Sequence, residues 1–148
     1  MKTKYFIFTA LMLTGIGFAS CTKSSSNPTI ANLTFLATLN GASEVPANLS
    51  TATGTATFTY NPNTYILSGT VTFTGIVATM AHIHLGAVGV SGAIVFPLGG
   101  ASPTSPISFV STALTTQEQS DLMNGLYYVN VHSATLPAGE IRGQLIQQ

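Results

Sequence analysis

The chain has 148 residues, of which 45% are hydrophobic and only 5% are charged, with a formal net charge of zero. This length and apolar content suit one globular domain with a hydrophobic core, and they exclude a disordered chain, which needs low hydrophobicity and high charge. Only four residues are lysine or arginine, so no basic patch exists to neutralise phosphates, which argues against nucleic acid as a partner.

The first twenty residues have the pattern of a secretory signal peptide. Lys2 and Lys4 give a positive start, and the apolar run 5–18 is shorter than the about 20 residues that a membrane-spanning helix needs. The run leads through small residues to Cys21, the only cysteine. This ending resembles the bacterial lipobox, in which such a cysteine is lipidated and becomes the new N-terminus. The sequence therefore predicts a lipoprotein signal peptide over 1–20 and a lipid on Cys21 as the link to the membrane.

This prediction places the mature protein outside the cytoplasm, on the periplasmic side of a bacterial membrane or at the cell surface. The alternative is an ordinary signal peptide with an incidental buried cysteine, but a lone cysteine has no disulfide partner to explain it. Residues 21–29 are small and polar and predict a flexible tether. The folded domain is predicted to cover 30–148.

The first half of this domain has the alternating pattern of antiparallel strands. In 33–39 every second residue is apolar, and Asn40-Gly41 then predicts a turn. Segments 53–60 and 65–74 alternate threonine or serine with apolar, aromatic or glycine residues, and the turn-forming residues 61–64 lie between them. This predicts a β-hairpin with one solvated face.

The second half adds further strands and one helix. Short strands are predicted around His82 and His84, over 93–98, 107–112 and 127–132, and from Gly139 to Leu145. Thr115 and Glu118 match a capping box and predict a short helix that stops at Gly125. The fold class predicted for the whole domain is all-β: an antiparallel β-sandwich, immunoglobulin-like or Greek-key-like, of about eight short strands with one short helix.

Two of the three histidines, His82 and His84, lie two residues apart in one predicted strand, so their side chains share a face. His132 lies in a second predicted strand far downstream. Three imidazoles with an open position suit zinc or copper. Glu140 is a further candidate ligand, or an acceptor that fixes an imidazole tautomer. The candidate metal site is therefore His82, His84, His132 and Glu140, and the candidate cofactor is copper or zinc.

The alternative is a structural polar network in which the histidines are hydrogen-bonded to Asn130, Glu140 and the backbone. Arg142 is the only basic residue of the predicted domain and shares a face with Glu140 and Gln144. A partly buried arginine that pairs with a carboxylate and with loop carbonyls could pin the last strand. A structural ion pair between Glu140 and Arg142 is therefore predicted, in preference to a ligand-binding arginine.

Several segments resemble the CHRD domain, a family first described in chordin. They are Leu39-Asn40-Gly41, Glu44-Val45-Pro46, Gly54-Thr55-Ala56, His82-Ile83-His84, the run from Tyr128 to His132, and the run from Pro137 to Gln144, in which Ala138 stands where glycine is commoner. The resemblance covers roughly 33–145. It implies a compact, sandwich-like extracellular module that is frequent in secreted and lipoprotein-type bacterial proteins, and it implies no settled enzymatic activity.

No catalytic residues are predicted. No Ser-His-Asp set emerges from the spacing, and a paired-carboxylate mechanism would need Glu44 and Glu140 to meet. A His-x-His strand in a sandwich also resembles copper–zinc superoxide dismutase, but that enzyme needs more histidines, an aspartate ligand and a disulfide. The sequence therefore predicts no enzymatic activity, and metal-dependent redox activity is the alternative to that prediction.

The predicted function is that of a lipid-anchored extracytoplasmic CHRD-domain protein with a non-catalytic binding or structural role, for which metal binding through the histidine cluster is one candidate. The alternative is a cell-surface module that binds an extracellular protein or a glycan, with purely structural histidines.

Overall fold

The structure, a computed structural model, describes residues 30–148. The predicted signal peptide, the lipidation site Cys21 and the predicted tether lie outside the described residues. Within residues 30–148 no helix is long and apolar enough to cross a membrane. The elements are β1 (Leu33–Asn40), the 3-10 helix η1 (Gly41–Ser43), β2 (Thr53–Asn61), β3 (Ile66–Thr74), β4 (Ala78–Leu85), β5 (Ala93–Leu98), β6 (Ile107–Ala113), α1 (Thr116–Met123), β7 (Tyr127–Ser133), β8 (Ile141–Gln144) and β9 (Ile146–Gln147).

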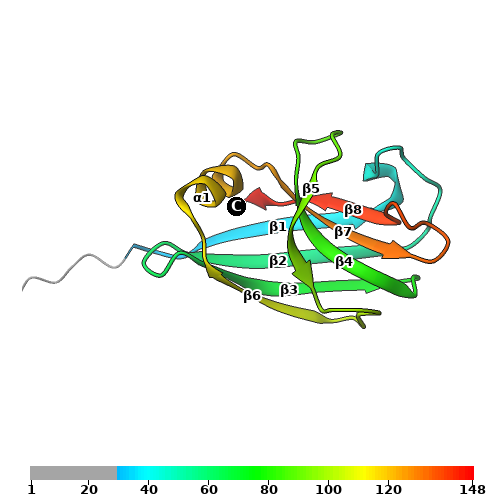
Figure 1. Cartoon of the computed structure of the whole chain (residues 1–148), viewed down its shortest axis with the longest axis horizontal. Helices are drawn as coiled ribbons and strands as arrows, with labels where there is room; N and C mark the ends of the chain where they lie inside the picture. The colour runs from blue at the N-terminus through cyan, green and yellow to red at the C-terminus, as the bar shows by residue number, and fades with distance from the viewer. Residues whose placement is uncertain (1–29) are drawn as a thin grey trace, which may run out of the picture.

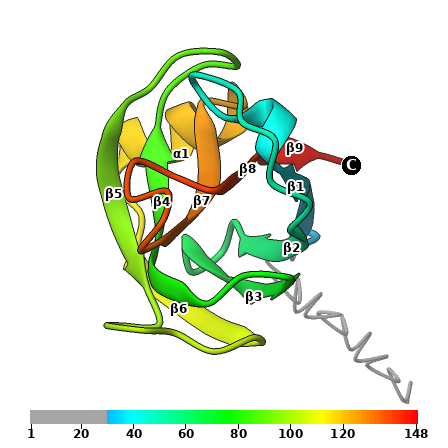
Figure 2. The ribbon, with the colours of Figure 1, turned by 90° about the vertical axis from the view of Figure 1, so that its right-hand side faces the viewer.

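The strands form one continuous sheet in the order β5-β4-β7-β8-β1-β2-β3-β6, with the short β9 beside β1. The pairings are antiparallel throughout. Figure 1 shows the long strands along the length of the molecule, with α1 at one end. The sheet curls until its edge strands β5 and β6 face each other (Figure 2), and the rings of Phe96 and Phe109 meet there with centroids 5.7 Å apart.

The prediction of an all-β antiparallel fold with about eight short strands and one short helix is confirmed. Hydrogen bonding continues from one half of the structure to the other, so the architecture is a nearly closed barrel made from a single sheet. The reason is that β8 pairs with both β7 and β1, which joins the β4-β7 half to the β1-β2-β3 half.

The core lies inside the curl and follows the alternation of the strands. Phe35 and Leu39 of β1, Phe58 of β2 and Ile83 of β4 are all fully buried. The hairpin β2-β3 pairs without interruption from Thr53↔Thr74 to Asn61↔Ile66, as the alternation predicted. Tyr65 does not join the apolar face, because it has a φ of 62° in the turn and is 48% exposed.

The helix begins and ends as its sequence predicts. Thr115 accepts from the Glu118 backbone N–H, and the Glu118 carboxylate accepts from the Thr115 backbone, which completes a capping box. Leu122 is fully buried and docks α1 on the end of the barrel. Gly125 follows with a φ of 65°, the left-handed conformation that glycine adopts without strain.

Strands β7 and β8 are buried on both faces, and so is β4 around His84. Their inner face carries Val129, Val131 and other core residues, but the outer face is also covered, by the loops 41–50, 86–92 and 134–139. All seven residues of β7 are buried, polar ones included. The outer face of these three strands therefore holds polar side chains away from water.

Candidate metal centre

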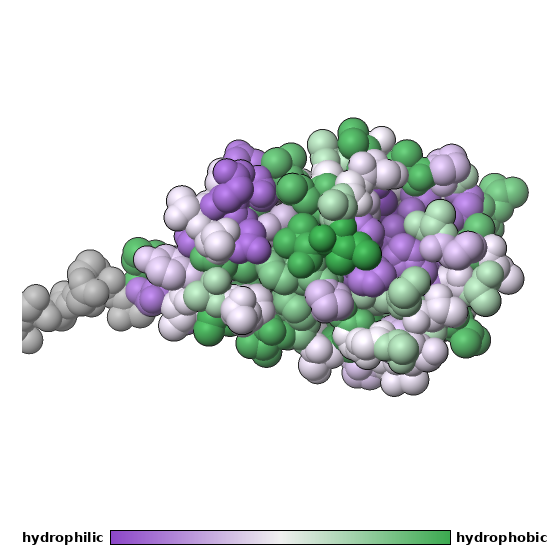
Figure 3. All heavy atoms as spheres, in the orientation of Figure 1, coloured by the Kyte–Doolittle hydropathy of each residue, from purple (hydrophilic) through white to green (hydrophobic). Residues whose placement is uncertain are grey.

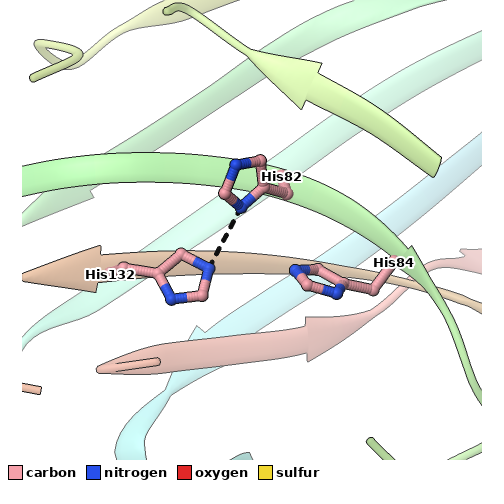
Figure 4. A group of neighbouring side chains, drawn as sticks. All are labelled: His82, His84 and His132. Carbon is pink, nitrogen blue, oxygen red and sulfur yellow. Dashed lines mark hydrogen bonds between the residues drawn. The ribbon is translucent and has the colours of Figure 1, made fainter. Parts of the chain in front are cut away.

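The three histidines lie on the covered outer face of β4 and β7. His82 and His84 alternate with the core residues Ala81 and Ile83, which are 1% and 0% exposed. In the β4-β7 register, His82 lies opposite Asn130, so His132 is its diagonal neighbour. Figure 4 shows the three rings gathered over the two strands.

The distances within the cluster suit one small ion. One ligand nitrogen from each ring can be chosen so that all three lie within 4.8 Å of one another. His82 Nδ1 lies 3.2 Å from His132 Nε2, within hydrogen-bonding distance. Nitrogens bound to one tetrahedral zinc at about 2.0–2.1 Å would be about 3.3 Å apart, so the widest pair must close by up to about 1.5 Å. The prediction that the three imidazoles lie together is confirmed; the binding of a metal stays a prediction.

Two of the rings have a tautomer that exposes a lone pair to the cluster. His84 Nδ1 lies 3.0 Å from the carbonyl oxygen of Gly92, and His132 Nδ1 lies 3.1 Å from that of Pro137. A carbonyl only accepts, so in each neutral ring Nδ1 carries the proton and Nε2 has the lone pair. His132 Nε2 can then accept from His82. His84 Nε2 is buried and has no hydrogen-bond partner among residues 30–148.

Burial favours the neutral form of the imidazoles. It is the largest cause that lowers the pKa of His82, His84 and His132, and the mutual repulsion of charged imidazoles lowers the pKa of His82 and His132 further. The hydrogen bonds to Gly92 and Pro137 raise the pKa of His84 and His132 again, but not enough to reverse the shift. A neutral imidazole with a free lone pair is the form that binds a metal.

Glu140 does not join the histidines. It comes just before β8, at the end of the sheet where the 41–50 loop crosses, and its Oε1 accepts from Ser50 Oγ at 2.7 Å. It lies outside the group of ligand atoms that the three histidines form. The carbonyls of Gly92 and Pro137, and not Glu140, accept from the imidazole Nδ1 atoms.

The Glu140–Arg142 ion pair is also absent from the described residues. The Arg142 side chain, 2% exposed, donates from Nη2 to the carbonyls of Ala87 and Val90, both at 3.0 Å. Arg142 therefore does fasten loop carbonyls, as expected of a pinning residue, but without Glu140. The reason is that loop 86–92 folds back over β8 and brings its carbonyls to the guanidinium.

Arg142 and His84 are linked by Tyr128, which was not among the predicted site residues. The Tyr128 ring stacks on the His84 ring, with centroids 5.0 Å apart and an interplanar angle of 9°. Arg142 Cζ lies 3.4 Å from the centre of the same ring. The Tyr128 hydroxyl accepts from the Gly92 N–H at 3.0 Å, so it holds the residue whose carbonyl orients His84. Alternation along 128–132 was the signal that could have found Tyr128.

Glu44 is the carboxylate that faces Arg142. Burial raises the pKa of Glu44 to about 6, against the opposing attraction of Arg142. Its Oε1 and the Oδ1 of Asn130 are both buried without a hydrogen-bond partner among residues 30–148. Figure 3 shows hydrophilic side chains gathered over β4, β7 and β8, beside a hydrophobic patch over β5. Unsatisfied polar groups thus concentrate on the same covered face as the histidines.

Comparison with known protein families identifies the family of this chain. Residues 35–145 match the family profile described as CHRD domain.

The chain belongs to the CHRD domain family.

The matched segment runs from β1 to the end of β8, so the histidine cluster and the loops that cover it lie inside the CHRD domain. Comparisons with curated proteins and with solved structures give no match.

Proposed function

We propose that this CHRD domain is a non-catalytic metal-binding module, with His82, His84 and His132 as ligands of one zinc or copper ion. The observation that carries the proposal is His84 Nε2. This atom is buried and has no hydrogen-bond partner within residues 30–148. The other ring nitrogen, Nδ1, donates to the carbonyl oxygen of Gly92. A bound cation would satisfy that lone pair.

The same observation weighs against a purely structural network. A buried polar atom without a partner costs about 1–3 kcal/mol, and native proteins keep few of them. A network built only for stability would have an N–H or O–H donor near His84 Nε2. Orientation of metal-bound imidazoles by a hydrogen bond at the far nitrogen is the usual arrangement in metalloproteins, and here Gly92 and Pro137 supply it.

We further propose that the module is displayed outside the cytoplasm of a bacterial cell through a lipid on Cys21. The support is the sequence of 1–21 alone: a positive start, an apolar run of secretory length and a lone cysteine after small residues. Intact-mass measurement of the membrane fraction tests it, since a Cys21→Ser variant would lose the added lipid mass.

Calorimetric titration of the metal-free, full-length chain with zinc(II) and copper(II) tests the metal proposal. We expect one ion to bind per chain and to raise the midpoint of thermal unfolding, because a ligand that binds only the folded state stabilises it. A His82→Ala/His84→Ala variant should lose both effects. A Thr57→Ala/Thr72→Ala variant, altered on the solvated face of the same barrel, should keep both.

The proposal fails if neither ion binds the wild-type chain while the histidine variant is merely less stable. The histidines would then be structural, and protein or glycan partners would become the functions to test.

A further inference from the structure

A fourth potential ligand lies on the same face as the histidines. Strand β4 alternates strictly here: Ala81 and Ile83 point into the core, so Met80, His82 and His84 share the outer face. Met80 is also directly opposite His132 in the β4-β7 register. The side chain is thus adjacent to His82 along the strand and to His132 across it.

The strand register places Met80 within reach of the cluster, directly opposite His132. Directly opposed residues in an antiparallel pair have Cβ atoms about 4.5–5.5 Å apart. Methionine is unbranched, with three rotatable bonds, so its sulfur can swing over a cross-strand neighbour. Met80 is 45% exposed, so part of its side chain lies in solvent and has room to change rotamer.

The cluster is open on the side of Met80. His84 and His132 are 8% and 6% exposed, closed in by Tyr128 and by the loops that carry Gly92 and Pro137. His82 is half-buried and Met80 is exposed, so solvent access increases across the face toward Met80. An ion held by the three imidazoles would have its open coordination position on that side.

We propose that the Met80 sulfur is the fourth ligand and that it makes the site selective for copper(I). This inference rests on the proposed function and deepens it. Thioether sulfur is a soft donor that favours copper(I), whereas zinc(II) is served equally well by water as the fourth ligand. Three neutral imidazoles and a thioether bring no negative charge, which suits a monovalent ion better than a divalent one.

The test compares Met80→Leu with Met123→Leu, a second exposed methionine on α1, far from β4 in sequence. Methionine and leucine have similar volumes, so neither change should disturb the fold. The full-length chains carry Cys21→Ser, because a free thiol would itself bind copper(I). Each is titrated anaerobically with copper(I) against the chelator bicinchoninate, and separately with zinc(II) by calorimetry.

We expect Met80→Leu to weaken copper(I) binding by at least about tenfold, because losing even an outer-shell partner of a metal ligand typically costs about 10–100-fold in affinity. Zinc(II) affinity should change by less than about threefold, since water can replace a thioether on zinc. Met123→Leu should change neither affinity. Copper X-ray absorption should show a sulfur neighbour in the wild type and in Met123→Leu, and none in Met80→Leu.

Two results would overturn the inference while leaving the proposed function intact. One is equal copper(I) affinity in the two methionine variants, which would mean a site of histidines alone. The other is an equal loss of zinc(II) and copper(I) in Met80→Leu, which would mean that Met80 shapes the cluster without selecting the metal. Absence of any metal binding by the wild type would overturn both proposals.

Discussion

The barrel has two outer faces, and both arise from strand alternation. One is exposed to water, and the other is largely covered by loops. On β1, β2 and β3 the outward residues are mostly threonines such as Thr55, Thr57 and Thr72, which are exposed. Thr55 and Thr72 bond to each other across the strands at 2.8 Å, and water satisfies the rest. On β4, β7 and β8 the outward residues include His84, Asn130, His132 and Arg142, which loops bury, whereas Met80 of the same face stays exposed.

The difference shows that polar atoms on a covered face need specific hydrogen-bond partners. An exposed hydroxyl exchanges one partner for water at little cost, whereas a buried polar atom needs a specific partner. Most atoms of the covered face have one, supplied by loop carbonyls. Of the four buried side-chain atoms without a partner in residues 30–148, two belong to this face, Asn130 Oδ1 and His84 Nε2, and a third, Glu44 Oε1, belongs to a loop that covers it. A face that is costly to build and left incomplete is typical of a binding site.

The largest effect that would sharpen this contrast is expected from Arg142→Ala. The change leaves the Ala87 and Val90 carbonyls and the Glu44 carboxylate without their cationic neighbour, and should lower the free energy of unfolding by about 3 kcal/mol. Thr57→Ala on the exposed face should cost less than about 1 kcal/mol. Urea unfolding of both variants measures the difference. Equal losses would contradict the distinction between the two faces.

A smaller effect is expected from a pair of glycines in the covering loop. A Cβ at Gly92 would collide with the Leu85 carbonyl, so Gly92→Ala must displace the backbone that orients His84. It should cost about 2 kcal/mol and weaken zinc(II) binding by about tenfold. Gly89→Ala in the same loop meets no atom within 4 Å; its φ of +76° alone should cost about 1 kcal/mol.

Urea unfolding and zinc calorimetry of the two glycine variants separate the two contributions. If Gly89→Ala weakened zinc(II) binding as much as Gly92→Ala, the orientation of His84 by the Gly92 carbonyl would not matter for the site.

The smallest effect is expected from the pH dependence of the metal-free protein. Burial lowers the pKa of His82 and His84 below 6.5, so their contribution to stability is full above about pH 6.5 and is lost as the pH falls below it. Glu44 acts in the opposite direction: its pKa is raised from 4.5 to about 6, so its contribution falls as the pH rises through that range.

Comparison with the histidine variant isolates the imidazoles, because Glu44 is present in both chains. The difference in unfolding free energy between the wild type and His82→Ala/His84→Ala should shrink or change sign between pH 7.5 and pH 5.5, measured with a chelator present. A difference independent of pH would mean that the imidazoles titrate as freely in the folded protein as in the unfolded chain.

The sequence alone determined the local structure and the facing of the side chains. Alternation predicted that His82 and His84 share a face and that 53–74 is a hairpin. The capping box predicted the start of α1. These features depend on residues a few positions apart, through the pleat of a strand and the unpaired N–H groups of a helix end, so a short segment is sufficient to specify them.

Only the tertiary structure decided what meets across the chain. Strand β7 lies beside β4, which places His132 and Met80 at the cluster. The strands have similar sequence patterns, so the sequence alone does not specify this pairing. Loops that fold back over the sheet account for three further features. These are the carbonyl partners of His84 and His132, the stack of Arg142 on Tyr128, and the separation of Glu140 from Arg142. Such contacts depend on the packing of the whole chain, because a main-chain carbonyl has no signature in the sequence and any residue can supply it.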